Sequence, residues 1–409
     1  MYFVITTFGC KVNQYESSGL SELLRENGFT PAPSPGSAAL HIINSCTVTE
    51  NSDRKVRRLI KRVRKENPGA AVVLCGCFPK AFPEKARAAG ADIVIAGTPT
   101  AARLPVSAQG ERTRAFLKIQ DGCDRGCAYC VIPKARGAPV SRALPDITAE
   151  AETLAACGHK EIVLTGINLS AYAADGGAGL TEAVGAVCAV PGLKRVRLSS
   201  LEPDLITKAD ITRLAGLKKL CPHFHLSLQS GSDAVLRRMN RRYDTAYYDE
   251  VVFWLREAFP GCSLTTDIIA GFPGETRAEF DETLAFAEKT GFAKIHAFAY
   301  SRREGTLAAS MPGQVPGEVK RERLVLLRAL ADRLRGEFFA RQTGGEREVL
   351  VEKTADGFSE GRAPDYTPVK VRGEFGRNEI VRVRITGVEG GFCLGEADEN
   401  RERRGAYDV

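Results

Sequence analysis

The sequence of 409 residues lacks a long apolar run, an internal repeat and a low-complexity block. A membrane-spanning helix needs about 20 consecutive apolar residues, and no stretch of that kind is present. The opening residues, MYFVITTFGCKVNQ, also lack the basic stretch with which a secretory signal peptide begins. We therefore expect no membrane partner and a location in the cytoplasm.

Disulfide bonds are not expected either, although the chain contains 12 cysteines. Thiols stay reduced in the cytoplasm, so this number of cysteines indicates metal or redox chemistry at some of them. Hydrophobic residues make up 44% and charged residues 26% of the chain, which is typical of a globular protein of several domains. The formal net charge of +7 permits a polyanionic partner.

The first segment, residues 1–104, alternates strand and helix patterns. Short β-rich apolar runs are separated by helical patterns such as QYESSGLSELLRENG, which ends in glycine. The order β-α-β-α-β-α-β predicts a small doubly wound parallel sheet. The runs that we interpret as strands are MYFVITTFG, HIINS, AAVVLC and ADIVIAG.

The second segment, residues 114–340, repeats this alternation after a linker at 98–113. Helical patterns again separate the apolar runs, and a long amphipathic helix follows Pro316. Six β/α units predict a partial, TIM-like (β/α)6 barrel, whose chemistry would lie at the carboxyl ends of its strands. The six strand candidates are AFLKIQ, EIVLTGIN, RVRLSS, HFHLSLQS, SLTTDIIAG and KIHAFAYS.

The third segment, residues 345–398, changes to a period of two. The runs EREVLVEK, YTPVKVRG and EIVRVRITGV alternate apolar and polar residues and are separated by turns that contain glycine. This pattern predicts a small all-β barrel.

Three cysteines lie together in DGCDRGCAYCVIPKARG, directly after the first barrel strand. Cys123, Cys127 and Cys130 form a C-x3-C-x2-C pattern, and no fourth Cys or His lies within the loop. Structural zinc requires four protein ligands, whereas a cubane iron–sulfur cluster with three thiolates keeps one iron open for another ligand. The spacing therefore favours a [4Fe-4S] cluster over zinc.

Three more cysteines follow successive strands of the first segment. Cys10, Cys46 and Cys77 each come after a predicted strand, beside Gly or Asn. Because ligands bind outside the carboxyl ends of parallel strands, these thiols should converge and hold a second cluster with an open iron. The alternative is that they are ordinary buried cysteines. Cys75 lies within the apolar strand, so we assign Cys77 as the ligand, and the other cysteines are interpreted as packing residues.

Polar residues follow the strands of the predicted barrel. In HFHLSLQS, strand alternation places Gln229 on one face with His225 and Ser227, which we interpret as the lumen. Polar groups at strand ends also cap helices and satisfy loops, and that alternative stays open. The candidates for contact with a cofactor are Gly166, Asn168, Ser200, Glu202, Gln229 and Asp267.

Basic residues gather on one predicted helix, DRKVRRLIKRVRKENPG, which begins shortly after Cys46. Its apolar residues recur at helical spacing, so one face is buried and the cations lie on the others. A solvated basic face is one interpretation, and contact with an RNA backbone is the other. Tyr366 of the third segment could stack on a base. The candidate RNA contacts are Arg57, Arg58, Lys61, Arg64, Lys370 and Arg372.

The first cysteine loop resembles that of radical S-adenosylmethionine (SAM) enzymes. Their pattern C-x3-C-x-aromatic-C is matched by Cys123, Cys127, Tyr129 and Cys130. The resemblance implies that SAM chelates the open iron, and that one electron cleaves it to a 5′-deoxyadenosyl radical. Tyr129 is then a cofactor-binding residue.

Over nearly its whole length the chain is similar to the methylthiotransferases of this class. The motifs that carry the resemblance are TFGCKVNQYES, NSCTVT, GCFPK, GCDRGCAYCVIPKARG, LSLQSGSDAVLRRMNRRY and TTDIIAGFPGET. GCKVNQYES is most similar to the branch that acts on N6-threonylcarbamoyladenosine (t6A) of tRNA, and GCFPK departs from the usual aromatic-Ala-Gln ending. The third segment resembles the TRAM domain, a small RNA-binding barrel.

The resemblance implies methylthiolation of C2 of t6A at position 37 of tRNA. One SAM would methylate a sulfur on the Cys10/Cys46/Cys77 cluster, and a second SAM at the Cys123 trio would start the replacement of C–H. A one-electron donor such as a flavodoxin or ferredoxin is then required, and we expect a monomer. The alternatives are the same chemistry on isopentenyladenosine tRNA or on a ribosomal-protein aspartate, and a non-catalytic iron–sulfur RNA-binding module.

Overall fold

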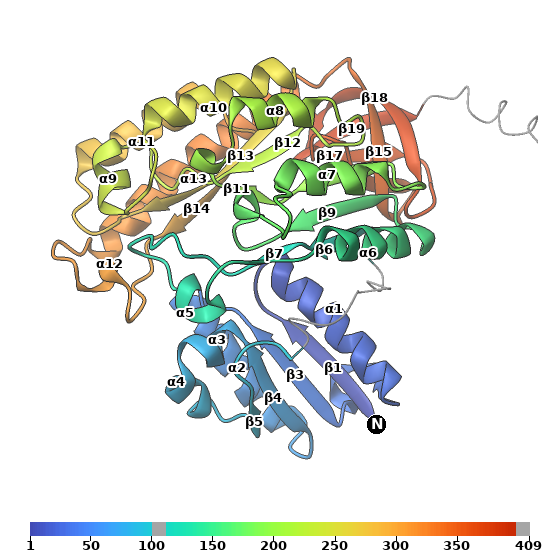
Figure 1. Cartoon of the computed structure of the whole chain (residues 1–409), viewed down its shortest axis with the longest axis vertical. Helices are drawn as coiled ribbons and strands as arrows, with labels where there is room; N and C mark the ends of the chain where they lie inside the picture. The colour runs from blue at the N-terminus through green and yellow to red at the C-terminus, as the bar shows by residue number, and fades with distance from the viewer. Residues whose placement is uncertain (100–111, 398–409) are drawn as a thin grey trace, which may run out of the picture.

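The N-terminal α/β domain lies against one side of a larger central α/β domain, and a β-barrel covers one end of the central domain (Figure 1). The computed structural model describes residues 1–99 and 112–397. Most of the predicted linker at 98–113, together with the predicted domain limits at 104 and 398, lies outside these residues. No helix among them is both long and apolar enough to cross a membrane.

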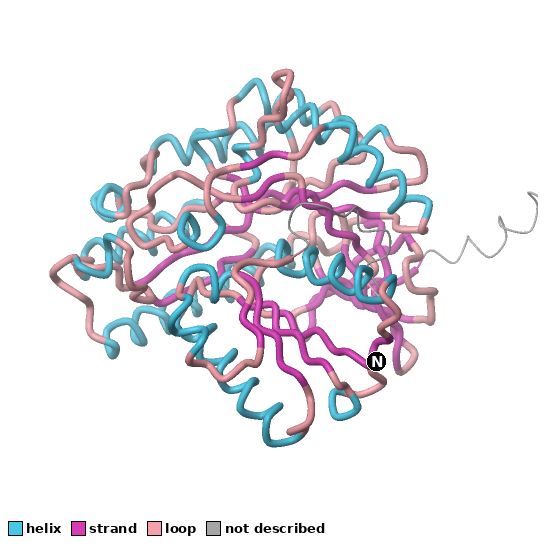
Figure 2. Tube along the Cα trace, turned by 60° about the horizontal axis from the view of Figure 1, so that its bottom comes forward, coloured by secondary structure: helices cyan, strands magenta, loops and turns pink. Residues whose placement is uncertain are grey.

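The N-terminal sheet has the strand order β2-β1-β3-β4-β5, and every neighbouring pair is parallel. Its strands fan out below the central domain (Figure 2). The prediction of a parallel sheet is confirmed, and only the edge strand β2, which is two residues long, was not predicted. The bounds are β1 Tyr2–Thr7, β2 Thr30–Pro31, β3 Leu40–Ser45, β4 Ala71–Gly76 and β5 Ile93–Val94.

Helices cover both faces of this sheet. Successive strand residues point to opposite faces, so Ile42 packs with Leu20 of α1 on one face. On the other face Ile43 packs with Val56 and Ile60 of α2. The bounds are α1 Lys11–Glu26, the 3-10 helix η1 Pro35–Ser37, α2 Glu50–Glu66, α3 Cys77–Ala81 and α4 Pro83–Arg87.

The central domain contains two parallel sheets, ordered β10-β9-β6 and β11-β12-β13-β14. Strands β10 and β11 are separated only by Ser199, so one chain segment joins the two sheets. Each of the six predicted runs overlaps at least one of these seven strands, and the run RVRLSS reaches both β10 and β11. The bounds are β6 Arg114–Lys118, β9 Glu161–Thr165, β10 Arg195–Leu198, β11 Ser200–Leu201, β12 His223–Leu226, β13 Ser263–Ala270 and β14 Lys294–Ala299, with a short antiparallel pair β7 Gln120–Asp121 and β8 Val140–Ser141.

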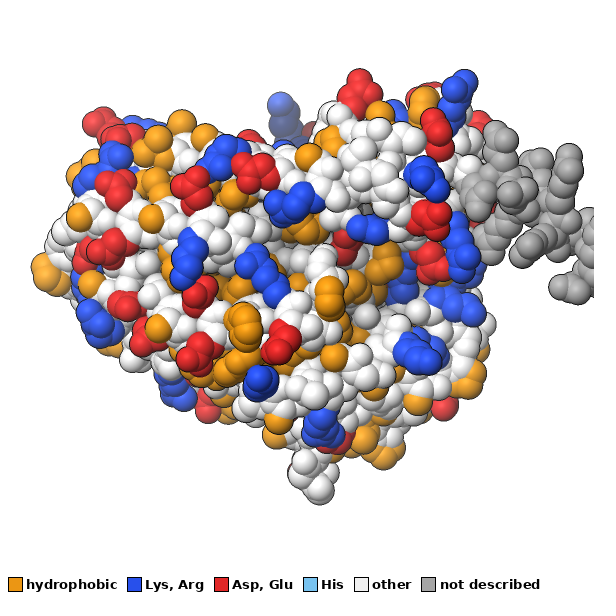
Figure 3. All heavy atoms as spheres, turned by 90° about the horizontal axis from the view of Figure 1, so that it is seen from above, with side chains coloured by type: hydrophobic (Ala, Val, Ile, Leu, Met, Phe, Trp, Pro, Cys, Tyr) orange, Lys and Arg blue, Asp and Glu red, His pale blue; other side chains and the backbone are white. Residues whose placement is uncertain are grey.

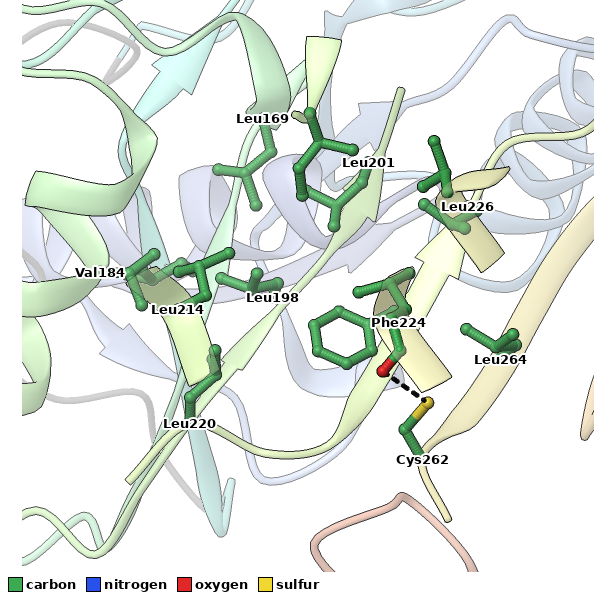
Figure 4. Close-up of a cluster of buried hydrophobic side chains, with 14 of the residues drawn as sticks. Leu169, Val184, Leu198, Leu201, Leu214, Leu220, Phe224, Leu226, Cys262 and Leu264 are labelled. Atoms are coloured by element: carbon green, nitrogen blue, oxygen red, sulfur yellow. Dashed lines mark hydrogen bonds between the residues drawn. The ribbon is translucent and has the colours of Figure 1, made fainter. Parts of the chain in front are cut away.

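The core of the central domain lies between its strands and its helices (Figure 4). Phe224 and Leu226 of β12 are fully buried in it, in one cluster with Leu198 of β10 from the other sheet. His225 lies between them in sequence and faces the other way, beside Asp267, as the alternation predicted. The helices are α5 Ile132–Arg136, α6 Leu144–Ala156, η2 Leu169–Ala171, α7 Leu180–Ala189, η3 Pro203–Leu205, α8 Lys208–Ala215, α9 Asp233–Arg238, α10 Thr245–Ala258, α11 Arg277–Thr290, α12 Leu307–Ser310 and α13 Gly317–Ala340.

The C-terminal strands form a closed barrel in the order β15-β16-β17-β19-β18. Phe338 and Phe339 at the end of α13 belong to its core and attach it to the central domain. Strands β16 and β19 were not predicted, because they contain Gly361 and Gly395 and a glycine weakens a strand pattern. A Cβ at Gly361 would lie 2.2 Å from the Leu350 carbonyl oxygen. The bounds are β15 Glu346–Ala355, β16 Phe358–Arg362, β17 Pro368–Arg372, β18 Ile380–Glu389 and β19 Phe392–Ala397.

Candidate active site

The loop that carries Cys123, Cys127 and Cys130 follows β6 and β7 and ends at α5. Gly122 enters the loop with φ +73°, and a Cβ at this position would lie 1.9 Å from the Ala138 carbonyl oxygen. The Cys130 amide donates to the Cys127 carbonyl at 3.0 Å, which turns the loop back on itself. The backbone therefore forms a tight turn that keeps the three thiols close.

None of these three thiols forms a disulfide, and all three are half-buried. Burial raises the pKa of Cys130 to about 12, and the charges of Cys127 and Cys123 add to the rise. Burial likewise raises the pKa of Cys123, with a contribution from Cys127. Three thiolates that repel one another at one point need a cationic centre, so this donor set fits an iron–sulfur cluster.

Two N–H groups point at these sulfurs. Arg241 Nη1 donates to Cys127 Sγ at 3.2 Å, and Asn168 Nδ2 lies 4.0 Å from Cys123 Sγ. Hydrogen bonds to ligating sulfurs stabilise the thiolate and tune a bound metal centre. Arg241 also pairs with Glu202. Arg241 was not predicted, although it lies in the quoted motif MNRRY, because no spacing relates it to Cys127.

Four of the predicted SAM-binding positions lie at the strand ends near the Cys123 loop. Asn168 has a buried Oδ1 without a partner among the described residues. Its backbone N–H donates to Gln120 Oε1 at 2.8 Å. A Cβ at Gly166 would lie 2.9 Å from that same Oε1. Glu202 is half-buried in its ion pair with Arg241, and Ser200 is exposed.

Asp267 lies on β13, Gln229 follows the adjacent strand β12, and Tyr129 lies in the Cys123 loop. The Gln229 amide donates to the Asp267 carbonyl at 2.8 Å, and Gln229 has φ +67°. The Asp267 carboxylate lies 3.4 Å from His225 Nε2, and the two interactions with His225 lower its pKa although burial raises it. The Tyr129 ring packs edge-on against Phe272 at 6.5 Å, and burial raises its pKa.

The structure also brings the other three predicted thiols together. Cys10 caps α1, Cys46 follows β3 and Cys77 begins α3. Burial raises the pKa of Cys77 to about 11, with contributions from the charges of Cys46 and Cys10. Asn13 bridges the group, since it accepts from Cys10 Sγ at 3.3 Å and its Nδ2 lies 3.9 Å from Cys77 Sγ. This donor set again consists of three thiols and fits a cluster with one open iron.

Cys75 lies on the other face of β4, fully buried with Ile42 and Val73 under α1. Gly76, with φ +93°, turns the chain between Cys75 and Cys77. Cys75 is thus placed as a packing residue and Cys77 as a member of the trio, which is how the sequence distinguished them.

Arg136 of α5 connects the two cysteine trios. It is the last residue of α5, and its charge opposes the rise in the pKa of Cys77 that burial causes. It forms ion pairs with Glu16 of α1 and with Asp121 at 3.3 Å. It also lines a cavity of about 760 Å³ between the N-terminal and central domains. The sequence had not singled out Arg136, because its partner Glu16 is 120 positions away.

Comparisons with known proteins agree with this arrangement. Residues 2–96 match the Uncharacterized protein family UPF0004, and residues 117–287 match the Radical SAM superfamily. A threonylcarbamoyladenosine tRNA methylthiotransferase of Thermotoga maritima is 39% identical, with 94% of this chain and 95% of that protein covered. A second, of Bacillus subtilis, is 36% identical over 93% of this chain and 92% of that protein.

The chain belongs to the radical SAM methylthiotransferase family. A tRNA-2-methylthio-N6-dimethylallyladenosine synthase of Anaeromyxobacter dehalogenans is also 36% identical, over 96% of this chain and 93% of that protein. Among solved structures, the radical SAM methyltransferase TsrM of Kitasatospora setae has a TM-score of 0.51 at 15% identity, covering 75% of this chain and 77% of that one. This last similarity concerns the fold alone.

The basic helix α2 of this methylthiotransferase exposes only some of its cations. Arg58 and Lys61 are exposed, and the half-buried Arg57 lines a cavity of about 900 Å³ at the boundary with the central domain. Arg64 instead forms an ion pair with Asp92 at 2.5 Å. The opposite face of the molecule mixes acidic and basic side chains (Figure 3).

In the C-terminal barrel Arg372 is exposed, whereas Lys370 lies over the Phe358 ring at 4.4 Å. The prediction that Tyr366 offers a stacking face is wrong. Its ring lies between the barrel and the central domain, where cations from both cover it and leave no face for a base. These neighbours are Arg114 and Arg197 at 4.8 Å and Arg362 at 5.1 Å, with the His223 ring at 5.0 Å.

Proposed function

We propose that this protein transfers a methylthio group to C2 of N6-threonylcarbamoyladenosine at position 37 of tRNA. The observation that carries the proposal is the pair of three-thiol sites, one on each side of the boundary between the N-terminal and central domains. The relatives from T. maritima and B. subtilis, which carry this activity in their names, support the choice of substrate.

In this proposal Cys123, Cys127 and Cys130 hold one [4Fe-4S] cluster, and Cys10, Cys46 and Cys77 hold the second. When bound, the clusters and SAM would supply reductive cleavage of SAM and the sulfur to be transferred. The chain supplies the thiolates and their hydrogen bonds. Arg241 donates a hydrogen bond to Cys127 Sγ and is itself held in place by its ion pair with Glu202.

The strand ends would bind SAM beside the first cluster. Asn168 offers a buried acceptor without a partner among the described residues. Gly166 keeps the backbone close to Gln120, where any side chain would collide. The remaining proposed contacts come from polar or aromatic groups around the same loop, namely Tyr129, Ser200, Glu202, Gln229 and Asp267.

Transfer RNA would approach over α2 and the C-terminal barrel, which we interpret as a TRAM-like domain. Exposed cations can pair with phosphates without reading bases. Arg64 is left out of this surface because its guanidinium is paired with Asp92. An electron donor such as a flavodoxin or ferredoxin, a monomeric state and a location in the cytoplasm complete the proposal. The cations are Arg57, Arg58, Lys61, Lys370 and Arg372.

The test is an anaerobic reaction of the reconstituted protein with stem-loops that carry t6A or N6-dimethylallyladenosine. Nucleoside mass spectrometry should find the 2-methylthio product from t6A. Cys127→Ala should abolish formation of 5′-deoxyadenosine, whereas Cys46→Ala should retain it and lose the product. If only the stem-loop with N6-dimethylallyladenosine gives product, the protein belongs to the branch that modifies that nucleoside. If Cys46→Ala still gives product, the assignment of the second cluster is refuted.

A further inference from the structure

Lys11 lies where the N-terminal domain meets the central domain. It is the first residue of α1, directly after Cys10, and α1 packs against β6. The charge of Lys11 contributes to lowering the pKa of Asp267 on β13 and of His296 on β14. Lys11 also interacts electrostatically with Tyr366, Arg114 and Arg197. The ammonium group therefore lies near inner strand residues, on the residue that directly follows Cys10 of the second trio.

The Lys11 ammonium has no partner within residues 1–99 and 112–397: no hydrogen bond or ion pair joins it to another side chain or carbonyl. Its side chain is half-buried, and burial lowers its pKa. Lys118 of β6, the strand against which α1 packs, is by contrast paired with Glu16 and Asp121. A cation that has lost water without gaining an anion is destabilised, and an anionic ligand would recover this free energy.

Asp267 is a carboxylate of the inner strands on which the charge of Lys11 acts, and it is already engaged. Asp267 lies beside His225 at 3.4 Å, and ligand atoms of His225, Asp267 and His296 all lie within 4.8 Å of one another. A divalent cation at this trio would meet the positive charge of Lys11, whose field reaches both Asp267 and His296. Lys11 together with His225, Asp267 and His296 therefore suits a ligand that carries hydroxyl groups and a negative charge better than it suits a divalent cation.

We propose that Lys11 binds the carboxylate of the threonylcarbamoyl group and so selects an N6 substituent with a negative charge. The inference rests on the proposed function, because t6A carries a carboxylate on its N6 substituent and N6-dimethylallyladenosine carries none. C2 and the N6 substituent flank the same ring nitrogen of adenine. A base whose C2 faces the Cys10 trio thus directs its substituent to groups beside Cys10, of which Lys11 is the immediate neighbour.

A site built to bind a charged group strongly rejects an analogue without it, because its own charge is then left unpaired. Hydrogen bonds to charged groups contribute about 1.5–3 kcal/mol, which corresponds to about a 10- to 100-fold preference. The wild-type protein should show this preference for the t6A stem-loop over a stem-loop with the neutral threoninamide analogue, in both the dissociation constant and kcat/KM.

Replacing Lys11 with methionine should remove that preference. In Lys11→Met, affinity and kcat/KM for the t6A stem-loop should fall by about 10- to 100-fold, whereas those for the amide analogue should change little. Lys11→Arg keeps the positive charge and should keep most of the preference. Lys61→Met is the matched control, since loss of a phosphate contact weakens binding of both stem-loops equally. Fluorescence anisotropy gives the dissociation constants, and 5′-deoxyadenosine and S-adenosylhomocysteine report on SAM.

Three results would overturn the proposal. If Lys11→Met loses equally on both stem-loops, the residue has only a structural role. If the Lys11→Met variant, assayed in the absence of RNA, no longer forms S-adenosylhomocysteine or 5′-deoxyadenosine, the ammonium acts on SAM instead of the substrate. If the wild-type protein modifies neither stem-loop, the proposed function itself fails, and this result is distinct because wild-type turnover on t6A is absent.

Discussion

Replacing Arg303 with methionine should loosen the N-terminal domain from the central domain. Arg303 lies in the chain between β14 and α12, and its Nη2 donates to Asp53 Oδ2 and to Thr47 Oγ1, each at 2.7 Å. The side chains of Arg303 and Asp53 are only 5% and 4% exposed. Thr47 directly follows Cys46, so the same contact also holds one end of the second cysteine trio.

The size of the effect follows from burial. Arg303→Met leaves the Asp53 carboxylate buried with Thr47 as its remaining partner, and an uncompensated buried charge costs about 3–5 kcal/mol. The neighbouring ion pair between Lys85 and Glu304 provides a control at the same boundary, because its side chains are 53% and 69% exposed. Exposed pairs contribute at most about 1 kcal/mol, so Lys85→Met should have little effect.

Hydrogen exchange measured by mass spectrometry tests this difference. If docking protects α2, amide exchange in Arg303→Met should be about 100- to 4000-fold faster there, since each 1.4 kcal/mol is a factor of ten. In Lys85→Met the amide exchange rate of α2 should change by about fivefold or less. Equal exchange in the two variants would refute the reasoning.

The same variant has a predicted pH dependence. Burial raises the pKa of Asp53, while Thr47 and Arg303 oppose that rise. Without Arg303 the folded pKa rises further above the unfolded one, so the carboxylate destabilises the fold above that pKa and the penalty disappears as it is protonated. The urea midpoint of Arg303→Met should therefore approach that of the wild type as the pH is lowered. If the difference in urea midpoint between Arg303→Met and the wild type grows as the pH is lowered, the predicted direction of the pH dependence is wrong.

Three further outcomes are expected. Cys77→Ser should reduce the iron content after reconstitution from about eight to about four per chain, whereas Cys75→Ser should leave both clusters, as iron analysis can show. Gly122→Ala should prevent assembly of the first cluster, because its Cβ would collide with the Ala138 carbonyl oxygen; a normal visible absorption spectrum would speak against this. Charge reversal in Arg58→Glu should weaken tRNA binding and make its salt dependence shallower by about one unit of slope; an unchanged slope would make α2 an ordinary solvated helix.

Much of the fold was predictable because it is encoded in short-range patterns. The period of two along β15 and β18, and the apolar runs that became β3 and β4, identify strands from a few neighbouring residues. The segments that were not predicted carry weak local signals. Strand β2 has two residues, and β16 contains a glycine required by the close approach of β15.

The sequence by itself determined the two sets of cysteines, because strand-end positions in parallel sheets and the C-x3-C-x2-C spacing are local features. Only the tertiary structure decided which charges surround them. Arg241 meets Cys127 across 114 positions, Arg303 meets Asp53 across 250, and Tyr366 is covered by arginines from another domain. Such contacts depend on how the domains pack, and hydrophobic burial drives that packing without regard to sequence distance. For the same reason the unpaired ammonium of Lys11 becomes visible only when the strands of the central domain are in place.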